Sequence, residues 1–160
     1  MLSNAHFTPE FAMLELDAID HRILSHLRTE GRVSILDLAE RVGLSPTPCG
    51  RRVKRLEEAG VITGYAAQID PQALGLNISV LIAVRLARSG AEASAEFLAA
   101  LRNRPEVVAC FLVTGNNIDY MLRVQVKDVD ALGHFIREVL QRIPAVGETS
   151  TMVVLKQGFD

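Results

Sequence analysis

The chain has 160 residues, of which 49% are hydrophobic and 22% are charged, and its formal net charge is −2. This composition is typical of a folded globular protein and excludes a disordered chain. Because the chain has no global basic field, any affinity for a polyanion must come from a local cluster of cations.

Membrane insertion, secretion and metal chemistry find no support in the sequence. The longest apolar stretches, such as Val80–Val84, are too short to span a bilayer. Residues 1–16 lack the basic-then-apolar design of a secretory signal, so we expect a cytoplasmic protein without a membrane partner. Cys49 and Cys110 are far apart, and the four histidines show no ligand spacing. We therefore expect two small core cysteines, no disulfide, no metal site and no cofactor.

Residues 1–15 are weakly patterned and are predicted to form an N-terminal arm. Met13 stands just ahead of the first clear helix. The sequence therefore leaves both Met1 and Met13 open as the true start of the protein.

Three short helices are predicted to follow the arm. The first runs from about residue 17 to Gly31, and the second ends at Gly43. The third is capped by Ser45, begins with Pro46 and ends at Gly60. The short turn between the second and third helices predicts a helix-turn-helix unit, in which the third helix enters the major groove of DNA.

The third helix carries a narrow apolar stripe and a cluster of cations. Cys49, Val53 and Leu56 recur at i, i+4 and i+7 and are predicted to face the core. The other faces hold positive charge, which suits the phosphates of DNA. The alternative is a solvated, salt-bridged helix face. The cations are Arg51, Arg52, Lys54 and Arg55.

The start of the third helix is the end that reaches base edges in such units. Arg51 is predicted to read guanine bidentately, and the other three cations are predicted to hold phosphate. For Arg55, an ion pair with Glu58 on the same helix is the alternative. The predicted DNA-binding residues are Ser45, Thr47, Pro48, Gly50, Arg51, Arg52, Lys54 and Arg55.

Val61–Ile69 alternates in polarity and is predicted to be a strand, with Gly64 permitting a bend. Such a strand fits the wing of a winged helix-turn-helix domain, which would then span residues 16–69. Asp70 and Pro71 break the strand and Gly75 follows, so residues 70–76 are predicted to be a hinge.

From residue 77 the apolar period changes from 3.6 to 2, and a second domain is predicted over residues 77–160. Its elements follow the order β-α-β-β-α-β, which is the ferredoxin-like arrangement. The chain is therefore predicted to be an α+β protein, with both helices of this domain on one face of a four-stranded sheet. The predicted strands are Asn77–Arg88, Val107–Val113, Asp119–Lys127 and Thr149–Lys156, and the helices are Ala91–Arg104 and 128–143.

The other face of this sheet is predicted to be apolar and uncovered. Leu81, Ala83 and half of Val107–Val113 point to it, and no further segment remains to cover it. An apolar face of that size is a partner interface or an aggregation liability. A two-fold dimer, sheet against sheet, would bury it and would place two basic helices for two DNA half-sites.

Four sequence motifs together resemble those of one family of bacterial and archaeal transcription factors. They are LDAIDHRIL, RVGLSPTPC, RVKRLEEAGVITGY and TGNNIDYMLRV. Through these motifs the chain resembles the Lrp/AsnC (leucine-responsive regulator) family from Leu16 to Gln157. The resemblance implies a winged helix-turn-helix joined to a ferredoxin-like effector domain. It also implies dimers that assemble into tetramers or octamers and that respond to amino acids or related small metabolites.

The turn after the second predicted strand of this domain is the expected effector site. Gly115, Asn116 and Asn117 offer backbone and amide groups, and Asp119 offers a carboxylate, as an α-amino acid requires. The alternative from composition is a plain Asn-rich hairpin. The resemblance adds further residues, so that the complete expected set is Leu112, Gly115, Asn116, Asn117, Asp119, Tyr120, Val129, Thr151, Met152, Val153 and Val154.

The sequence departs from the family pattern at two functional positions. Gly50 stands where the family usually carries a larger side chain, and the turn from Gly115 to Asp119 is one residue longer than the common form. The first departure bears on sequence preference for DNA. The second bears on the identity of the ligand.

Catalysis and DNA architecture are the rival functions. The sequence offers no nucleophile–base pair, metal cluster or glycine-rich phosphate loop, so we expect no enzymatic activity. An architectural protein that organises DNA without an effector would share the helix-turn-helix and the oligomer. We predict a sequence-specific, nucleoid-associated transcriptional regulator whose assembly and DNA affinity respond to an amino acid or related metabolite.

Overall fold

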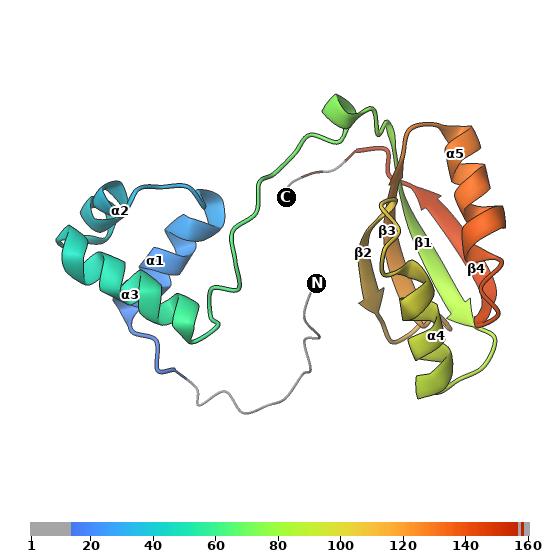
Figure 1. Cartoon of the computed structure of the whole chain (residues 1–160), viewed down its shortest axis with the longest axis horizontal. Coiled ribbons are helices and arrows are strands. Elements are labelled where there is room, and N and C mark those ends of the chain that lie inside the picture. Colours follow the sequence, from blue (N-terminus) through green and yellow to red (C-terminus); the bar gives the residue numbers. More distant parts are fainter. Residues whose placement is uncertain (1–13, 157, 159–160) are drawn as a thin grey trace. The chain divides into compact units, whose positions relative to one another are not determined.

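The computed structural model describes residues 14–156 and residue 158. The described residues divide into two compact units on either side of the boundary between Gln68 and Ile69, and these units are coloured blue to green and green to red in Figure 1. The predicted arm, apart from its last two residues, lies outside the described residues. In the described part of the chain, no helix is long and apolar enough to cross a membrane.

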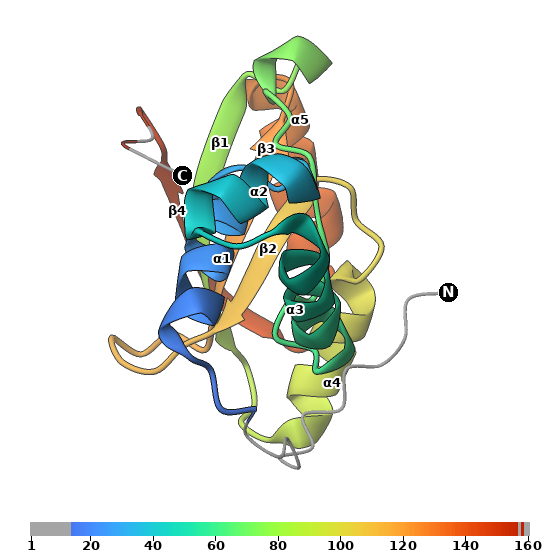
Figure 2. The ribbon, with the colours of Figure 1, turned by 90° about the vertical axis from the view of Figure 1, so that its left-hand side faces the viewer.

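The described part of the N-terminal unit contains three helices, α1 (Ala18–Thr29), α2 (Ile35–Val42) and α3 (Pro46–Glu58), which Figure 2 shows from the side of this unit. Gly43 ends α2 in the left-handed conformation, with φ of 72°. Each helix turns an apolar stripe toward a common core. The buried core residues are Ile23, Leu38, Ala39, Val42, Cys49, Val53 and Leu56.

The prediction for α3 is confirmed in full at its C-terminal end and in part at its N-terminal end. Pro46 is the first helical residue, as predicted, but the Ser45 side chain makes no capping hydrogen bond. At the other end, Gly60 has a φ of 69°, and the Leu56 carbonyl accepts from the backbone N–H groups of Val61 and Ile62 at 2.9 and 3.0 Å. These bonds close the helix in the left-handed manner that glycine permits.

The strand predicted for Val61–Ile69 is wrong. Residues 61–69 belong to no strand, because no neighbouring strand of this unit is present among the described residues to complete a ladder. Tyr65 is instead held against the helices, since its hydroxyl donates to Glu57 Oε1 at 2.8 Å.

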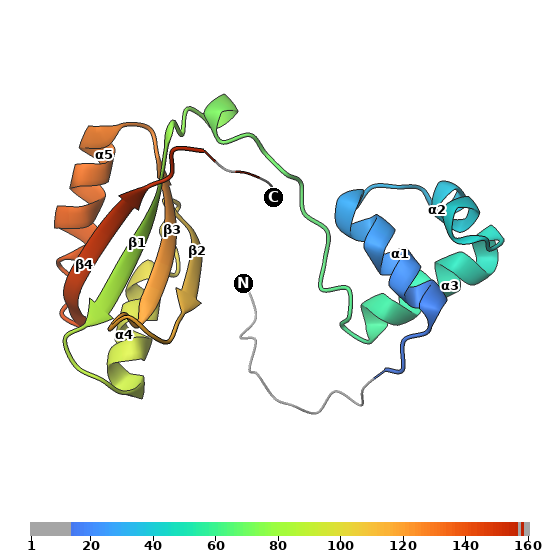
Figure 3. The same ribbon diagram turned by 180° about the vertical axis from the view of Figure 1, so that it is seen from behind.

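The C-terminal unit is a four-stranded antiparallel sheet with two helices, in the order β-α-β-β-α-β. Its strand order is β2-β3-β1-β4, as the ferredoxin-like prediction requires, and Figure 3 shows the four strands side by side. A short 3-10 turn, η1 (Gln72–Leu74), precedes the sheet. The elements are β1 (Ile78–Leu86), α4 (Ala91–Leu101), β2 (Val107–Leu112), β3 (Tyr120–Val126), α5 (Val129–His134), which continues as the π-helical segment η2 (Phe135–Leu140), and β4 (Val146–Val153).

Alternate residues of the central strands β1 and β3 pack beneath the helices. Val80, Ile82 and Val84 are fully buried, and the opposed residues of β3 are buried with them. Phe97 of α4 and Phe135 of the last helix fill the layer above, so both helices cover the same face of the sheet. The single-face prediction is confirmed.

The opposite face of the sheet is apolar in its middle. The strand register places Leu81 opposite Met152 on β4, and Met121 opposite Phe111 on β2. Phe111 is 55% exposed and Met152 is 46% exposed. No element among the described residues covers this side, which we call the open face and define by Leu81, Phe111, Met121 and Met152.

An exposed cysteine and a close backbone approach lie at the edges of the sheet. Cys110 on the edge strand β2 is exposed, so only Cys49 is the core residue that the sequence predicts. A bulge interrupts the pairing of β1 with β4 next to Leu86. There Gly147 lies so close to β1 that an added Cβ would be 3.1 Å from the backbone N and Cα of Ala87.

Candidate functional site

Cationic side chains on the solvent-exposed face of α3 line a depression, which we call the cation-lined hollow. Helical spacing places Arg51 and Lys54 opposite the buried stripe, and both are exposed. Between these side chains lies a depression of about 450 Å³, lined by Arg51, Arg52, Lys54, Arg55 and Glu58. Lys54 pairs with Glu58 at 3.6 Å, but both side chains are at least two-thirds exposed, and an exposed pair of this kind contributes little to stability. A phosphate group is the natural complement of such a surface.

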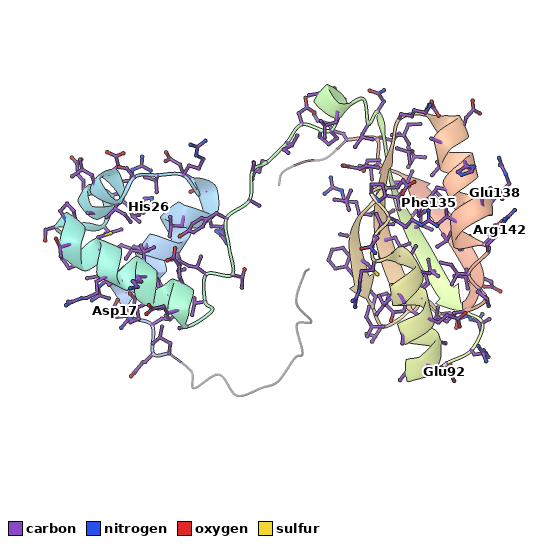
Figure 4. All side chains as sticks on the ribbon, in the orientation of Figure 1. Asp17, His26, Glu92, Phe135, Glu138 and Arg142 are labelled. Atoms are coloured by element: carbon purple, nitrogen blue, oxygen red, sulfur yellow. The ribbon has the colours of Figure 1, made fainter. Side chains whose placement is uncertain are left out.

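Two of these arginines also contact carboxylates of α1. Arg52 Nη1 donates to Asp17 Oδ2 at 2.7 Å and to Asp20 Oδ1 at 2.8 Å. Arg55 Nη2 donates to Asp20 Oδ2 at 2.5 Å. Figure 4 shows Asp17 beside α3. Each arginine therefore faces the cation-lined hollow on one side and an acidic pair on the other.

The acidic pair is fixed by the start of α1. Asp17 Oδ1 accepts from the backbone N–H groups of Ile19 and Asp20, and Asp20 Oδ2 accepts from the N–H of Asp17, which completes a reciprocal capping box. The hydrogen bond from the Asp20 N–H and that from Arg52 lower the pKa of Asp17 to about 2. Asp20 is fully buried, and a buried carboxylate requires a paired cation.

Arg52 and Arg55 were predicted to hold phosphate, which stays a prediction; in the structure their guanidinium groups contact carboxylates. The predicted alternative for Arg55 is wrong, because Lys54 and not Arg55 pairs with Glu58. The sequence did contain a signal. Arg52 lies three residues after Cys49 and four before Leu56, which places it beside the buried stripe and not opposite to it.

The other predicted DNA contacts stand at the start of α3. Ser45 and Thr47 are exposed, whereas Pro48 and Gly50 are half-buried. A Cβ added at Gly50 would lie 3.6 Å from Ile35 Cγ2, which is an ordinary van der Waals distance. The glycine is therefore not required by crowding.

The predicted effector loop adopts an unusual backbone. Gly115, Asn116 and Asn117 have φ values of 109°, 51° and 59°, a run of positive values that glycine and asparagine tolerate best. The Asp119 carboxylate, predicted to bind an ammonium group, accepts from the backbone N–H of Leu86 at 2.8 Å. Asp119 therefore ties the loop to β1.

A depression of about 190 Å³ lies beside this loop. Asn116 and Asn117 line it, as predicted, together with residues that the sequence analysis did not include. Of these, Arg85 and Glu148 are cross-strand partners on β1 and β4, and their charged atoms are 3.6 Å apart. Arg85 could have been found from the sequence, because it follows Ala83 on the alternate face of a predicted strand. The remaining lining residues are Ala83, Ile118, Thr149 and Ser150.

The other expected effector residues do not gather at this depression. Tyr120 is 2% exposed and packs in the core, with its ring 4.7 Å from that of Phe97. Leu112 and Val129 are more than 70% exposed, at the ends of β2 and α5. Thr151, Met152, Val153 and Val154 continue along and beyond β4 and do not line this depression.

Metal chemistry has no candidate in the described residues. No group of three or more His, Cys, Asp or Glu side chains is placed there to hold an ion. The chemistry available is ionic and hydrogen-bonding recognition at the two depressions.

Comparison with known protein families assigns both units. Residues 16–63 match a winged helix-turn-helix DNA-binding model, and residues 79–160 match the Lrp/AsnC ligand binding domain. The chain is 41% identical to the leucine-responsive regulatory protein of Salmonella typhimurium over 143 residues, which cover 89% of this chain and 87% of that protein. It is 40% identical to the protein of the same name from Escherichia coli K12, with the same coverage.

Solved structures agree with this assignment. A transcriptional regulator from Neisseria meningitidis, solved as a complex with L-Met, matches with a TM-score of 0.86 at 38% identity, over 91% of this chain and 94% of that one. AsnC from E. coli matches with a TM-score of 0.80 at 28% identity, over 92% and 97%. The chain belongs to the Lrp/AsnC family of transcriptional regulators, whose members carry a winged helix-turn-helix and a ligand-binding domain.

Proposed function

We propose that this protein is a DNA-binding transcriptional regulator that reads DNA with the outward face of α3 and responds to an amino acid or a related metabolite. The observation that carries the proposal is the cation-lined hollow of about 450 Å³ on that face. A protein with a net charge of −2 needs such a local cluster to hold a polyanion. A role on DNA places the protein in the cytoplasm, on the nucleoid.

Within α3, we assign Arg51 to a base edge and Lys54 to a phosphate, because both are exposed opposite the core. Ser45, Thr47, Pro48 and Gly50 form the helix start that approaches the groove. Arg52 and Arg55 lie beside them and are hydrogen-bonded to Asp17 and Asp20.

Arg51→Ala tests this assignment. The variant should bind duplex DNA more weakly, and the slope of log Kobs against log salt should stay constant, because the assigned contact is to a base and not to a phosphate. A slope that is shallower by about 0.9 would instead assign Arg51 to a phosphate. Arg142→Ala, which removes a cation from the other unit, is the matched control. If Arg51→Ala binds a DNA sequence selected with the wild type as tightly as the wild type does, α3 is not the helix that reads DNA.

The ligand-binding domain offers a site for a zwitterion. Arg85 suits a carboxylate, Glu148 suits an ammonium group, and the amides of Asn116 and Asn117 lie on the rim of the same depression. The Neisseria regulator of the same family was solved with L-Met, which supports an amino-acid ligand.

Isothermal titration with each of the twenty amino acids tests the ligand class. We expect binding by at least one, and loss of that binding in Arg85→Gln. Arg142→Gln is the control, because Arg142 also pairs with an exposed glutamate, Glu138, away from the loop. Silence from all twenty would exclude free amino acids as ligands.

We also propose that the open face joins two copies of the chain. An apolar face of this extent is covered in soluble proteins, and a two-fold dimer would pair two α3 helices with two half-sites. Dimers would assemble further, to tetramers or octamers as the family resemblance implies. A ligand that favours one assembly would then change DNA affinity through a coupling energy of about 1–3 kcal/mol.

Analytical ultracentrifugation of Phe111→Glu tests the interface. A charge at Phe111 on the open face should shift the protein toward the monomer, whereas Leu36→Glu on α2 changes an exposed apolar side chain in the other unit and should not. DNA footprints that do not change when the ligand is added would favour the architectural alternative.

A further inference from the structure

We propose that Asp17 and Asp20 act as an internal counter-charge that withholds Arg52 and Arg55 from DNA phosphates and so sets the number of phosphates that α3 can bind. This inference rests on the proposed DNA-binding role of α3. It makes the two aspartates positioning residues for DNA recognition, although neither lies on the recognition helix.

The two arginines face two kinds of acceptor with the same groups. Arg52 and Arg55 line the cation-lined hollow, and the same guanidinium groups donate to Asp17 and Asp20 at 2.5–2.8 Å. A phosphate entering the hollow and the aspartates therefore compete for one set of N–H donors. Arg51 has no ion pair within 4.0 Å in the described part of the chain, so it meets no such competition.

The charges of the two aspartates and the two arginines balance. The four groups comprise two carboxylates and two guanidinium groups, so the cluster is neutral as it stands. A lysine or arginine displaces a counterion from DNA only when it contacts a phosphate, and a guanidinium group that is held by an aspartate is less available for that contact. In the free protein, α3 thus offers fewer effective charges than the four cations in its sequence.

The two aspartates are unequal. Asp20 is fully buried and holds both arginines, so its replacement also removes a structural tie. The Asp17 side chain is 52% exposed and contacts only Arg52 among the cations of α3. Asp17 is therefore the aspartate whose charge can be removed with least effect on the fold.

The experiment measures DNA binding by Asp17→Asn as a function of salt. Asparagine caps a helix as well as aspartate does, so α1 keeps its N-cap. With a short duplex of random sequence, and between about 50 and 200 mM salt, we expect tighter binding and a slope of log Kobs against log salt steeper by about 0.9, the value for one added phosphate contact.

Two controls separate this effect from a general loss of negative charge. Asp128→Asn removes an N-cap carboxylate of the same kind from α5, where it caps the Ala131 N–H, and should leave the slope unchanged. In Asp17→Asn, Asp20 remains the partner of both arginines, so the cluster carries one positive charge that is not neutralised. The double variant Asp17→Asn with Arg52→Gln should lose the added slope, because this charge is removed with Arg52. Folding of each variant is checked by its urea midpoint.

The outcomes divide clearly. An unchanged slope in Asp17→Asn, or a steeper slope that persists without Arg52, overturns the counter-charge. Binding by Asp17→Asn together with no binding by the wild type supports it. Absence of DNA binding in both proteins, at every salt concentration, overturns the proposed function as well as this inference.

Discussion

Among the described residues, the N-terminal unit buries seven hydrophobic side chains in its core, whereas the C-terminal unit buries sixteen. The larger core belongs to a sheet whose strands are also fixed by backbone pairing. The smaller core belongs to three short helices, in which the ion cluster of Asp17, Asp20, Arg52 and Arg55 adds a link from α1 to α3. In the N-terminal unit, ion pairs thus help to hold the helices together, whereas in the C-terminal unit apolar packing holds the elements together.

The largest expected effect breaks the C-terminal core. Phe97→Ala should lower the free energy of unfolding of this unit by about 3–5 kcal/mol, because the ring is fully buried. Leu98→Ala, at the neighbouring position of α4 but 42% exposed, should cost far less. Urea unfolding of both variants measures the difference, and similar losses would contradict the core described here.

The next effect addresses the N-terminal unit. Arg52→Gln together with Arg55→Gln leaves the Asp20 carboxylate buried without a cation, which should cost about 1–3 kcal/mol of unfolding free energy. Arg51→Gln together with Lys54→Gln removes the same charge from the outward face and should change stability by about 0.5 kcal/mol or less. Equal losses in the two double variants would show that the ion cluster is not a structural link.

A smaller effect, of opposite sign, is expected within α3. Gly50→Ala should raise the free energy of unfolding by about 0.5–1 kcal/mol, since alanine favours a helix and its Cβ meets only an ordinary contact with Ile35. The midpoint of thermal unfolding measures this gain. A loss of stability would mean that the helix start is more crowded than its distances indicate.

The smallest effect is a pH dependence from Asp17. Its pKa is about 2 in the folded protein, below the ordinary value of 3.8, so it contributes stability that is complete above the ordinary value and is lost as the pH falls through about 2. Urea midpoints between about pH 5 and pH 2 should therefore fall less for Asp17→Asn than for the wild type. Parallel curves would contradict the low pKa.

Local patterns predicted most of the fold because the responsible residues are neighbours in sequence. Gly43 and Gly60 end helices by their own backbone preference, and the alternation along Ile78–Leu86 follows from one covered face of a sheet. The pairing of Asp20 with Arg52 spans 32 residues, and no local pattern contains it. The effector role of Tyr120 came from the resemblance alone and stays a prediction, whereas the strand register places its side chain in the core.

The close approach of Gly147 to β1 limits which sequences this fold accepts. Any side chain at this position would press on backbone atoms of Ala87, and a backbone cannot rotate away as a side chain can. The next residue, Glu148, is the one that faces Arg85 across the strands. If the depression at Arg85 and Glu148 is the ligand site proposed above, a substitution at Gly147 would change ligand affinity by displacing Glu148, although Gly147 does not line the depression. We expect altered sensitivity, with DNA recognition retained, to be its phenotype.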